Sequence, residues 1–134
     1  NMSDVKVARE FVTGSPVILA DKDRLQEVFV VLILNAVDAM PKKGRLTIKT
    51  GYSRDNEFVE VRISDTGVGI KREHLERLGE PFFTTKESGK GLGMGLTIAY
   101  EIVTRHKGKI EVTSAPGEGT TFLLQFHVIG KAGA

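Results

Sequence analysis

Cysteine is absent from this chain of 134 residues, which excludes disulfides, cysteine-based metal sites and thiol catalysis. A large excess of charge of one sign is also missing: the net charge of +2 is too small to indicate a nucleic-acid partner or a membrane surface. The longest apolar run, Val28 to Leu34, is far too short to span a bilayer. The sequence opens on an amphipathic segment without a signal peptide, as expected of an excised domain.

The remaining composition is that of a soluble globular protein, with 40% hydrophobic and 27% charged residues. A chain of this length is long enough to bury a core of its own. We therefore expect residues 1–134 to form a single domain that is a monomer when isolated.

Glycine is concentrated in one region, the stretch from Asp65 to Gly95. Four glycines alternate with other residues at its end, at positions 89, 91, 93 and 95. A helical pattern starts directly after them. Glycine is costly in regular structure and is used where the backbone approaches another group closely or takes positive φ. Glycine-rich backbone leading into a helix N-terminus suits an anion, because free N–H groups and the helix dipole point at it. The stretch therefore predicts a site for a nucleotide phosphate.

Alternating apolar residues predict several strands. They are expected at Asp4–Phe11, Pro16–Ala20, around Leu46–Tyr52, around Val59–Ile63, around Ile110–Val112 and from Phe122 to Val128. Loops or turns are expected at residues 13–16, 42–44, 53–56 and 116–119.

Three helices are predicted between these strands. Asp23 and Gln26 fit a capping box at the start of a long helix that ends before Pro41. Its segment VFVVLIL is also compatible with a buried strand, but the cap and the flanking helix formers favour one buried helix. Residues 71–78 fit a short polar helix, and residues 94–107 fit a helix capped by Gly108. Mixed strands and helices with hairpins predict a two-layer α/β sandwich.

Two polar residues stand out beside the glycines. Asn35 lies on the predicted buried helix, and Asp65 follows a strand and precedes Gly67 and Gly69. Taken alone, Asn35 is typical of an amide that bonds local backbone near a helix end, and Asp65 is typical of a turn.

Taken together, four segments resemble the ATP-binding catalytic domain of sensor histidine kinases, in the superfamily that includes Hsp90, DNA gyrase and MutL. They match the N box (LNAVDAM, residues 34–40), the G1 box (DTGVGI, residues 65–70), the F box (PFFTTK, residues 81–86) and the G2 box (GKGLGMGL, residues 89–96). The ending GKIEVTSAPGEGTTF, residues 108–122, is also similar to that family. The form of the F box resembles the nitrogen-regulation branch of these kinases.

The resemblance implies the Bergerat (GHKL) fold, a mixed and mostly antiparallel sheet with helices on one face and an ATP lid. It implies ATP and Mg²⁺ as cofactors, with Asp65 accepting from the adenine amino group and Asn35 offering an oxygen to Mg²⁺. Asn35 and Lys86 would act in catalysis, and Phe82 and Phe83 would contact the lid or the partner domain. The nucleotide site would comprise Asn35, Asp38, Ala39, Asp65, Gly67, Gly69, Ile70, Phe83, Thr84, Thr85, Lys86, Gly89, Lys90, Gly91, Leu92, Gly93, Met94, Gly95, Leu96 and Thr121.

Two positions depart from the family pattern. Val31 stands one turn before Asn35, where many members carry Asn and gyrase-like ATPases carry a Glu that activates water. Valine can neither bind Mg²⁺ nor act as a base, which argues against an efficient ATPase. Asp38 stands where a phosphate-contacting Lys or Arg is common. Candidates to replace that cation are Lys42, Lys43, Lys86 and Lys90.

The phosphate acceptor in this family is a histidine on a separate dimeric helical hairpin. None of His74, His106 and His127 lies in such a context, so this chain resembles the ATP-holding half of a cytoplasmic or membrane-anchored kinase. Its phosphate would reach a response regulator indirectly. Two other interpretations stay open: an anti-sigma-factor-type serine kinase relative, and a binding module of the same fold that has lost Mg²⁺ binding.

Overall fold

The computed structural model describes residues 4–10, 16–18, 20–78, 93–128 and 130–131. Along the chain the elements are β1 (Asp4–Glu10), β2 (Pro16–Val17), α1 (Lys22–Asp38), β3 (Lys43–Tyr52), β4 (Phe58–Asp65), α2 (Arg72–Leu75), α3 (Gly93–Arg105), β5 (Lys109–Ser114), β6 (Thr120–His127) and β7 (Gly130–Lys131).

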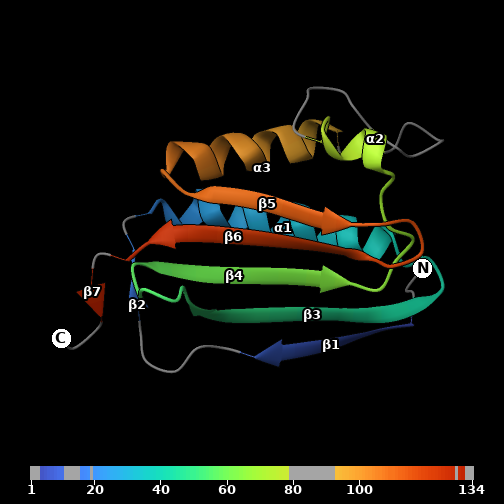
Figure 1. The fold of residues 1–134 in the computed structure, drawn as a ribbon, viewed down its shortest axis with the longest axis horizontal. Helices are drawn as coiled ribbons and strands as arrows, with labels where there is room; N and C mark the ends of the chain where they lie inside the picture. The colour runs from blue at the N-terminus through green and yellow to red at the C-terminus, as the bar shows by residue number, and fades with distance from the viewer. Residues whose placement is uncertain (1–3, 11–15, 19, 79–92, 129, 132–134) are drawn as a thin grey trace.

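A five-stranded sheet forms one layer of the molecule, in the order β1-β3-β4-β6-β5 (Figure 1). Strand β1 pairs with β3 in parallel, and the other three pairs are antiparallel. The parallel pair requires a crossover, which α1 supplies between β1 and β3. Strands β2 and β7 form a separate antiparallel ladder. The predicted mixed, mostly antiparallel sheet is therefore confirmed.

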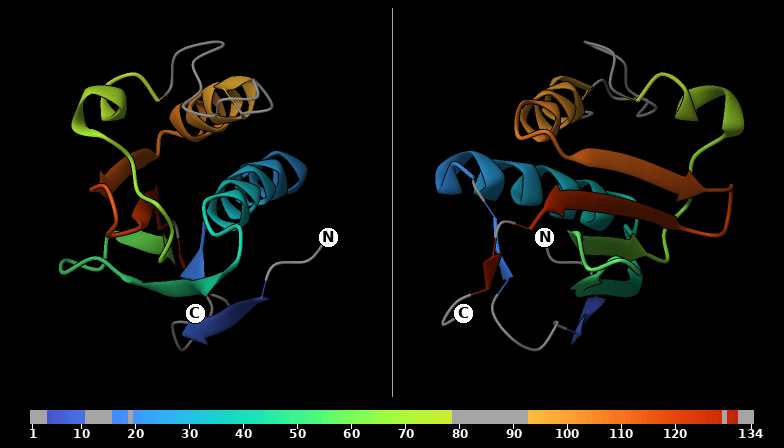
Figure 2. Two further views of the ribbon diagram at one scale, coloured as in Figure 1. Left: turned by 90° about the vertical axis from the view of Figure 1, so that its right-hand side faces the viewer. Right: turned by 60° about the vertical axis from the view of Figure 1, so that its left-hand side comes forward.

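Helices α1 and α3 form the second layer and cover one face of the sheet (Figure 2). Alternating residues of the strands face these helices because side chains on a strand change face at every position. The core that results contains Val28, Leu32 and Ala36 of α1, Ala99 and Val103 of α3, and Leu46, Ile63, Phe122, Leu124 and Phe126 of the sheet. This is the predicted two-layer α/β sandwich.

Helix α1 confirms the interpretation of VFVVLIL as helix, but its exposure is uneven. Val28, Leu32 and Ala36 recur every four residues and are buried. Val30 and Leu34 point away from the core and are 54% and 49% exposed. The apolar sequence all around the helix predicts burial against a sheet, which is confirmed for the inner side, whereas the outer side is exposed. The part of the chain that the structure describes contains no helix with the length and apolarity needed to cross a membrane.

The start of α1 lies two residues earlier than predicted. Asp21, not Asp23, is the N-cap, and its carboxylate Oδ1 accepts from the N–H groups of Asp23 (3.1 Å) and Arg24 (3.2 Å). A contact from the distant end of α3 holds the cap, because the Asp21 N–H donates to Nε2 of His106 at 3.0 Å. Asp23 instead lies in the first turn, where its charge favours the helix dipole.

The end of α3 also differs from the sequence prediction. The helix covers Gly93–Arg105, and Lys107 adopts the left-handed conformation, with φ of 59°, that was expected of glycine. The Lys107 N–H donates to the Thr104 carbonyl and the Gly108 N–H to the Val103 carbonyl, both at 2.9 Å. These two bonds make a Schellman cap in which His106 is the C-cap, and Lys107 and Gly108 are the first and second residues after it.

Other boundaries move by smaller amounts. Strand β2 contains two residues where five were predicted, and α2 contains four helical residues where eight were predicted. Strand β3 begins at Lys43, inside the predicted loop, because its first residues pair with Asp4 and the following residues of β1. This parallel pairing joins distant segments, which local sequence patterns do not report.

Candidate functional site

Asp65 is the last residue of β4 and carries a half-buried carboxylate. Its Oδ1 atom accepts hydrogen bonds from the N–H of Gly67 at 2.8 Å and the N–H of Thr120 at 3.2 Å. Burial raises the pKa of Asp65 above its usual range, and the two backbone hydrogen bonds oppose that shift in part. Among the described residues none donates to Oδ2, so this oxygen is available to a ligand that brings a donor.

The loop after Asp65 is packed so closely that two positions admit only glycine. A Cβ atom on Gly67 would lie 2.5 Å from the carbonyl oxygen of Ala39, which also accepts from the Val68 N–H at 3.1 Å. Gly69 has φ of +78°, and a Cβ there would overlap the Ala115 carbonyl. The loop therefore packs tightly between the end of α1 and the turn that joins β5 to β6.

A set of hydroxyl groups fixes the same loop from the side of β5 and β6. Ser114 Oγ accepts from the Ile70 N–H, donates to the Gly119 carbonyl and contacts Thr120 Oγ1, each at 2.8 Å. Thr121 Oγ1 lies 2.9 Å from Ser64 Oγ on the neighbouring strand. The carboxylate of Asp65 is thus held in place by a connected network.

Sequence reasoning missed most of this network. It selected Thr121, whose hydroxyl contacts Ser64, and overlooked Thr120, which is 6% exposed and whose N–H reaches Asp65. The available signal was the glycine pair around Glu118 followed by two threonines, since positive-φ glycines allow backbone to approach closely. Gly119 has φ of +78°, and a Cβ on it would overlap the Asp65 carbonyl.

Asn35 reaches the same region from α1. It lies one turn before Ala39, the residue against which Gly67 packs, and residues four apart on a helix are neighbours on its surface. Asn35 is half-buried, and among the described residues none hydrogen-bonds its side-chain amide. Val31, one turn further back, is half-buried and contributes no oxygen, and Asp38 is exposed at the end of the helix.

The first turn of α3 comes from the end of the glycine-rich stretch, with Gly93, Met94 and Gly95 followed by Leu96. Leu96 is 8% exposed and belongs to the core, so it fixes the helix start rather than presenting a side chain outward. Figure 1 shows that α3 begins toward the same end of the molecule as the last turn of α1 and the end of β4. The remaining expected site residues lie outside the described residues: Phe83, Thr84, Thr85, Lys86, Gly89, Lys90, Gly91 and Leu92.

A metal held entirely by protein ligands finds no support in the described part of the chain, where no group of three His, Asp or Glu side chains is suitably placed. The single amide oxygen of Asn35 fits a different arrangement. Mg²⁺ commonly takes one or two protein oxygens and completes its shell with water and phosphate. Lys42 and Lys43, two candidate phosphate contacts, are exposed at the start of β3.

Comparison with known proteins agrees with the geometry. Residues 20–129 match the family model described as histidine kinase-, DNA gyrase B- and HSP90-like ATPase. The chain is 37% identical over 128 residues to sporulation kinase E of Bacillus subtilis (strain 168), covering 96% of this chain and 17% of that protein. Thus the chain spans about a sixth of the length of this relative.

Solved structures give the same result at the level of the fold. The nucleotide-free catalytic domain of histidine kinase ThkA has a TM-score of 0.77 at 27% identity, covering 92% of this chain and 80% of that one. Full-length ShkA in complex with AMPPNP has a TM-score of 0.78 at 26% identity, covering 92% of this chain and 26% of that one. With the family model matching most of its length, this chain belongs to the family of histidine kinase-, DNA gyrase B- and HSP90-like ATPases.

Proposed function

We propose that residues 1–134 are one ATP-binding catalytic domain of a sensor histidine kinase. The domain binds ATP with Mg²⁺ and donates the γ-phosphate to a histidine on a separate helical hairpin, from which a response regulator receives it. The observation that carries this proposal is the carboxylate of Asp65, which is half-buried, held by two backbone N–H groups and open at Oδ2. An acceptor of this kind suits the amino group of adenine.

The other chemical groups have complementary roles in this proposal. Asn35 supplies one oxygen to Mg²⁺, whose charge compensates that of the phosphates. The first turn of α3 offers backbone N–H groups and the positive end of the helix dipole to a phosphate. Phosphoryl transfer depends on positioning and charge neutralisation more than on covalent catalysis by the protein. Lys86 is proposed as the cation that replaces a base at the position of Asp38.

Three further assignments belong to the proposal. We assign the chain to the nitrogen-regulation branch of the sensor kinases, supported by the form of the F box. ATP is the phosphoryl donor, so the domain faces the cytoplasm, whether or not the full kinase is anchored in a membrane. The isolated domain is a monomer without a nucleic-acid partner, consistent with its net charge of +2.

One alternative to the kinase function is favoured by a specific observation. Val31 is half-buried beside Asn35 on α1 and offers no oxygen, as a module that has lost Mg²⁺ binding would show. An anti-sigma-factor-type serine kinase is a weaker competitor, because the PFFTTK segment favours the histidine kinases.

Calorimetric titration with ATP, in the presence and absence of Mg²⁺, tests the proposal and separates it from the degenerate module. We expect ATP to bind, Mg²⁺ to strengthen the binding, and GTP to bind poorly because its base presents a carbonyl where adenine presents an amino group. Absence of ATP binding would refute the kinase proposal, and ATP binding that is indifferent to Mg²⁺ would favour the degenerate module.

A further inference from the structure

A cavity of about 460 Å³ opens at the end of the molecule remote from Asp65. On strand β6 Thr120 pairs with Asp65, and His127 pairs with Phe58 at the other end of β4. Seven residues of strand at about 3.3 Å each separate the two ends by roughly 23 Å. His127 lines the cavity, which is therefore distinct from the candidate nucleotide site.

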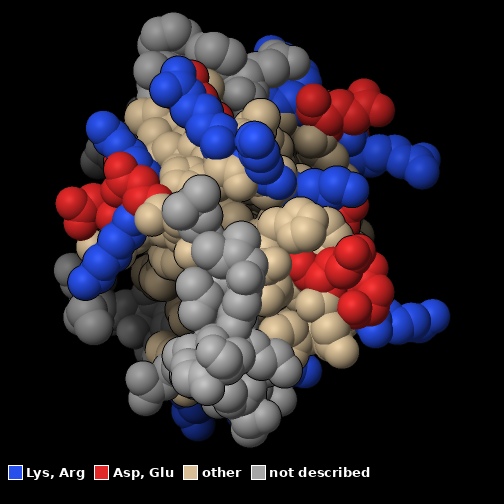
Figure 3. All heavy atoms as spheres, turned by 90° about the vertical axis from the view of Figure 1, so that its left-hand side faces the viewer, with Lys and Arg blue, Asp and Glu red and all other residues tan. Residues whose placement is uncertain are grey.

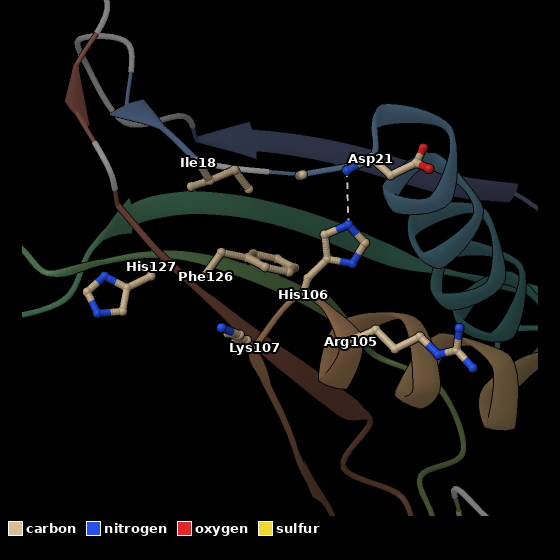
Figure 4. A pocket seen from close by; sticks show the side chains of 8 residues that line it. Ile18, Asp21, Arg105, His106, Lys107, Phe126 and His127 are labelled. Carbon is tan, nitrogen blue, oxygen red and sulfur yellow. Dashed lines mark hydrogen bonds between the residues drawn. The ribbon is translucent and has the colours of Figure 1, made fainter.

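The floor of the cavity is apolar and its rim is basic (Figure 4). Ile18, Ala20 and Phe126 contribute the apolar surface, and Phe126 is only 2% exposed. Arg105, Lys107 and His127 also line the cavity, and all three are exposed. The combination suits a ligand with an apolar body and anionic flanks.

Hydrogen bonds fix one wall of the cavity before any ligand binds. His106 Nδ1 lies 2.8 Å from the Ile102 carbonyl, which can only accept, so Nδ1 carries the proton. His106 Nε2 then accepts from the Asp21 N–H at 3.0 Å. The ring thereby joins the end of α3 to the start of α1, and Figure 4 shows this bond at the cavity. A preformed wall lowers the entropic cost of binding.

Among the described lining residues, Asp21 alone carries negative charge, and this charge is already compensated. The carboxylate of Asp21 accepts the N–H groups of Asp23 and Arg24 at the positive end of α1. Arg105 lies 3.7 Å from Glu101, but both side chains are more than half exposed, so this pair is weak. Figure 3 looks onto this end of the molecule and shows basic side chains across its upper part, with acidic ones at the flanks.

The conformation of Lys107 is a second feature of the rim. Its φ of 59° is unfavourable for a side-chain-bearing residue, and glycine would cap α3 without that strain. Strained residues concentrate at binding and catalytic sites. At this position the strained backbone places an ammonium group at the mouth of the cavity.

We propose that this cavity docks an apolar side chain of an acidic peptide segment from a partner protein. The apolar floor receives the side chain, and Arg105, Lys107 and His127 pair with flanking carboxylates. Charge complementarity selects an acidic segment over a neutral or basic one and raises its association rate.

The test uses a blocked pentapeptide with a central leucine and two glutamates on each side, titrated into the ¹⁵N-labelled chain. We expect amide shifts confined to the lining, including Ala20, His106 and His127. Arg105→Glu and Lys107→Glu should each weaken binding about tenfold, and the matched reversal Lys6→Glu, on exposed strand β1, should change it less than twofold. Peptides with glutamine for glutamate or alanine for leucine should bind more weakly.

Thermal melts of each variant show whether it is folded, and Arg105→Gln replaces Arg105→Glu if the reversal unfolds the chain. The proposal is overturned if the pentapeptide gives no shifts at millimolar concentration, or if Lys6→Glu weakens binding as much as Arg105→Glu. It is also overturned if inorganic phosphate reproduces the same shifts at equal concentration, or if vesicles with anionic phospholipid bind through Arg105 while the peptide does not.

Discussion

Asp65 shows, at the scale of one residue, how a candidate binding site can lower the stability of the folded chain. Its carboxylate is half-buried, and burial is the larger cause of its raised pKa, so ionisation costs more free energy in the folded chain than in the unfolded chain. Two backbone N–H groups orient one oxygen, but they offset only part of the free-energy cost of burying the charged carboxylate. A ligand that donates to the second oxygen would compensate the remaining charge, which is why we assign this residue to nucleotide binding.

Asp65→Asn should weaken ATP binding and leave the fold intact. A hydrogen bond to a charged group contributes roughly 1.5–3 kcal/mol, which corresponds to about 10- to 150-fold in affinity. The amide can still present an oxygen, so the lower end of this range is accessible, and GTP should bind poorly to both proteins. Isothermal titration calorimetry measures the change, and an unaltered ATP affinity would remove the adenine role from Asp65.

The same substitution should raise the stability of the ligand-free chain at neutral pH. The gain should be less than about 1 kcal/mol, because water still screens a half-buried carboxylate. The folded chain binds the Asp65 proton more tightly than the unfolded chain, in which the pKa of Asp65 is near 3.8. The gain in stability from Asp65→Asn should therefore be largest at pH values above the raised pKa of the folded chain. It should vanish as the pH falls toward 3.8. Urea denaturation from pH 7 to pH 3.5 measures it, and an advantage that grows on acidification would contradict this sign.

Val31→Asn should make ATP binding more dependent on Mg²⁺. Val31 lies one turn before Asn35, so a new amide there would add an oxygen on the same side of α1. The substitution should also destabilise the ligand-free chain by about 1–3 kcal/mol, because a polar group enters an apolar surface. Titrations at several Mg²⁺ concentrations compare the two proteins. Equal Mg²⁺ dependence would show that Val31 does not line the metal site.

At the scale of elements, the candidate site is formed where the end of α1, the loop after β4 and the β5–β6 turn meet. Their backbones approach so closely that no side chain fits between them. The loop after β4 packs against the end of α1 through Gly67 and against the β5–β6 turn through Gly69. Gly119 approaches Asp65 from the other side. Each approach is between backbones, so small changes at these glycines should displace the carboxylate.

Two glycines of the β5–β6 turn provide a matched test of this close packing. Both have φ of +78°, but a Cβ on Gly117 would meet nothing within 4 Å, and one on Gly119 would overlap the Asp65 carbonyl. Gly117→Ala should cost about 1–2 kcal/mol of unfolding free energy through backbone strain alone. Gly119→Ala should cost roughly 2–4 kcal/mol and also weaken ATP binding. Denaturation measures the unfolding free energy of both variants, and calorimetry measures their ATP affinity. Equal losses of stability and affinity in the two variants would contradict the packing argument.

At the scale of the whole molecule, the antiparallel pair of strands β4 and β6 separates the candidate nucleotide site from the basic cavity. Asp65 and Thr120 lie at one end, and Phe58 and His127 at the other, where the rings of Phe58 and His127 are 4.9 Å apart. His106 and His127, which lie at the end away from Asp65, are poorly placed to accept phosphate. His106 follows the end of α3, roughly 20 Å from the first turn at 1.5 Å per residue, and both of its ring nitrogens are engaged.

The isolated chain should therefore bind ATP without labelling itself from the γ-phosphate. A nucleophile must be presented in line with that phosphate, and neither His106 nor His127 reaches it. Adding the dimeric helical hairpin of the parent kinase should restore labelling on the hairpin, slowly at low concentration because the tether is lost. Radiolabelled ATP tests each piece alone and then the mixture. Acid-labile label on the isolated chain would contradict this division of roles.

The sequence by itself determined which segments contribute to the candidate site and in what order. The glycine stretch was identified because the demands of glycine are a local property of the chain. Asn35 and Asp65 became candidates only through the resemblance of four ordered segments to the sensor histidine kinases, since each alone is typical of a local structural role. The same local patterns predicted the sandwich and most of its strands. The residues of the F box and of most of the G2 box stay predictions, because they lie outside the described residues.

Only the tertiary structure decided which local candidates are used and what they contact. Asp21 rather than Asp23 caps α1 because His106, 85 residues away, bonds its N–H. Thr120 reaches Asp65 because β4 and β6 pair with Thr120 opposite Asp65. The basic cavity exists because the end of α3, the end of β6 and the segment before α1 meet at one end of the sheet. Each of these depends on contacts between distant segments, which no local pattern contains.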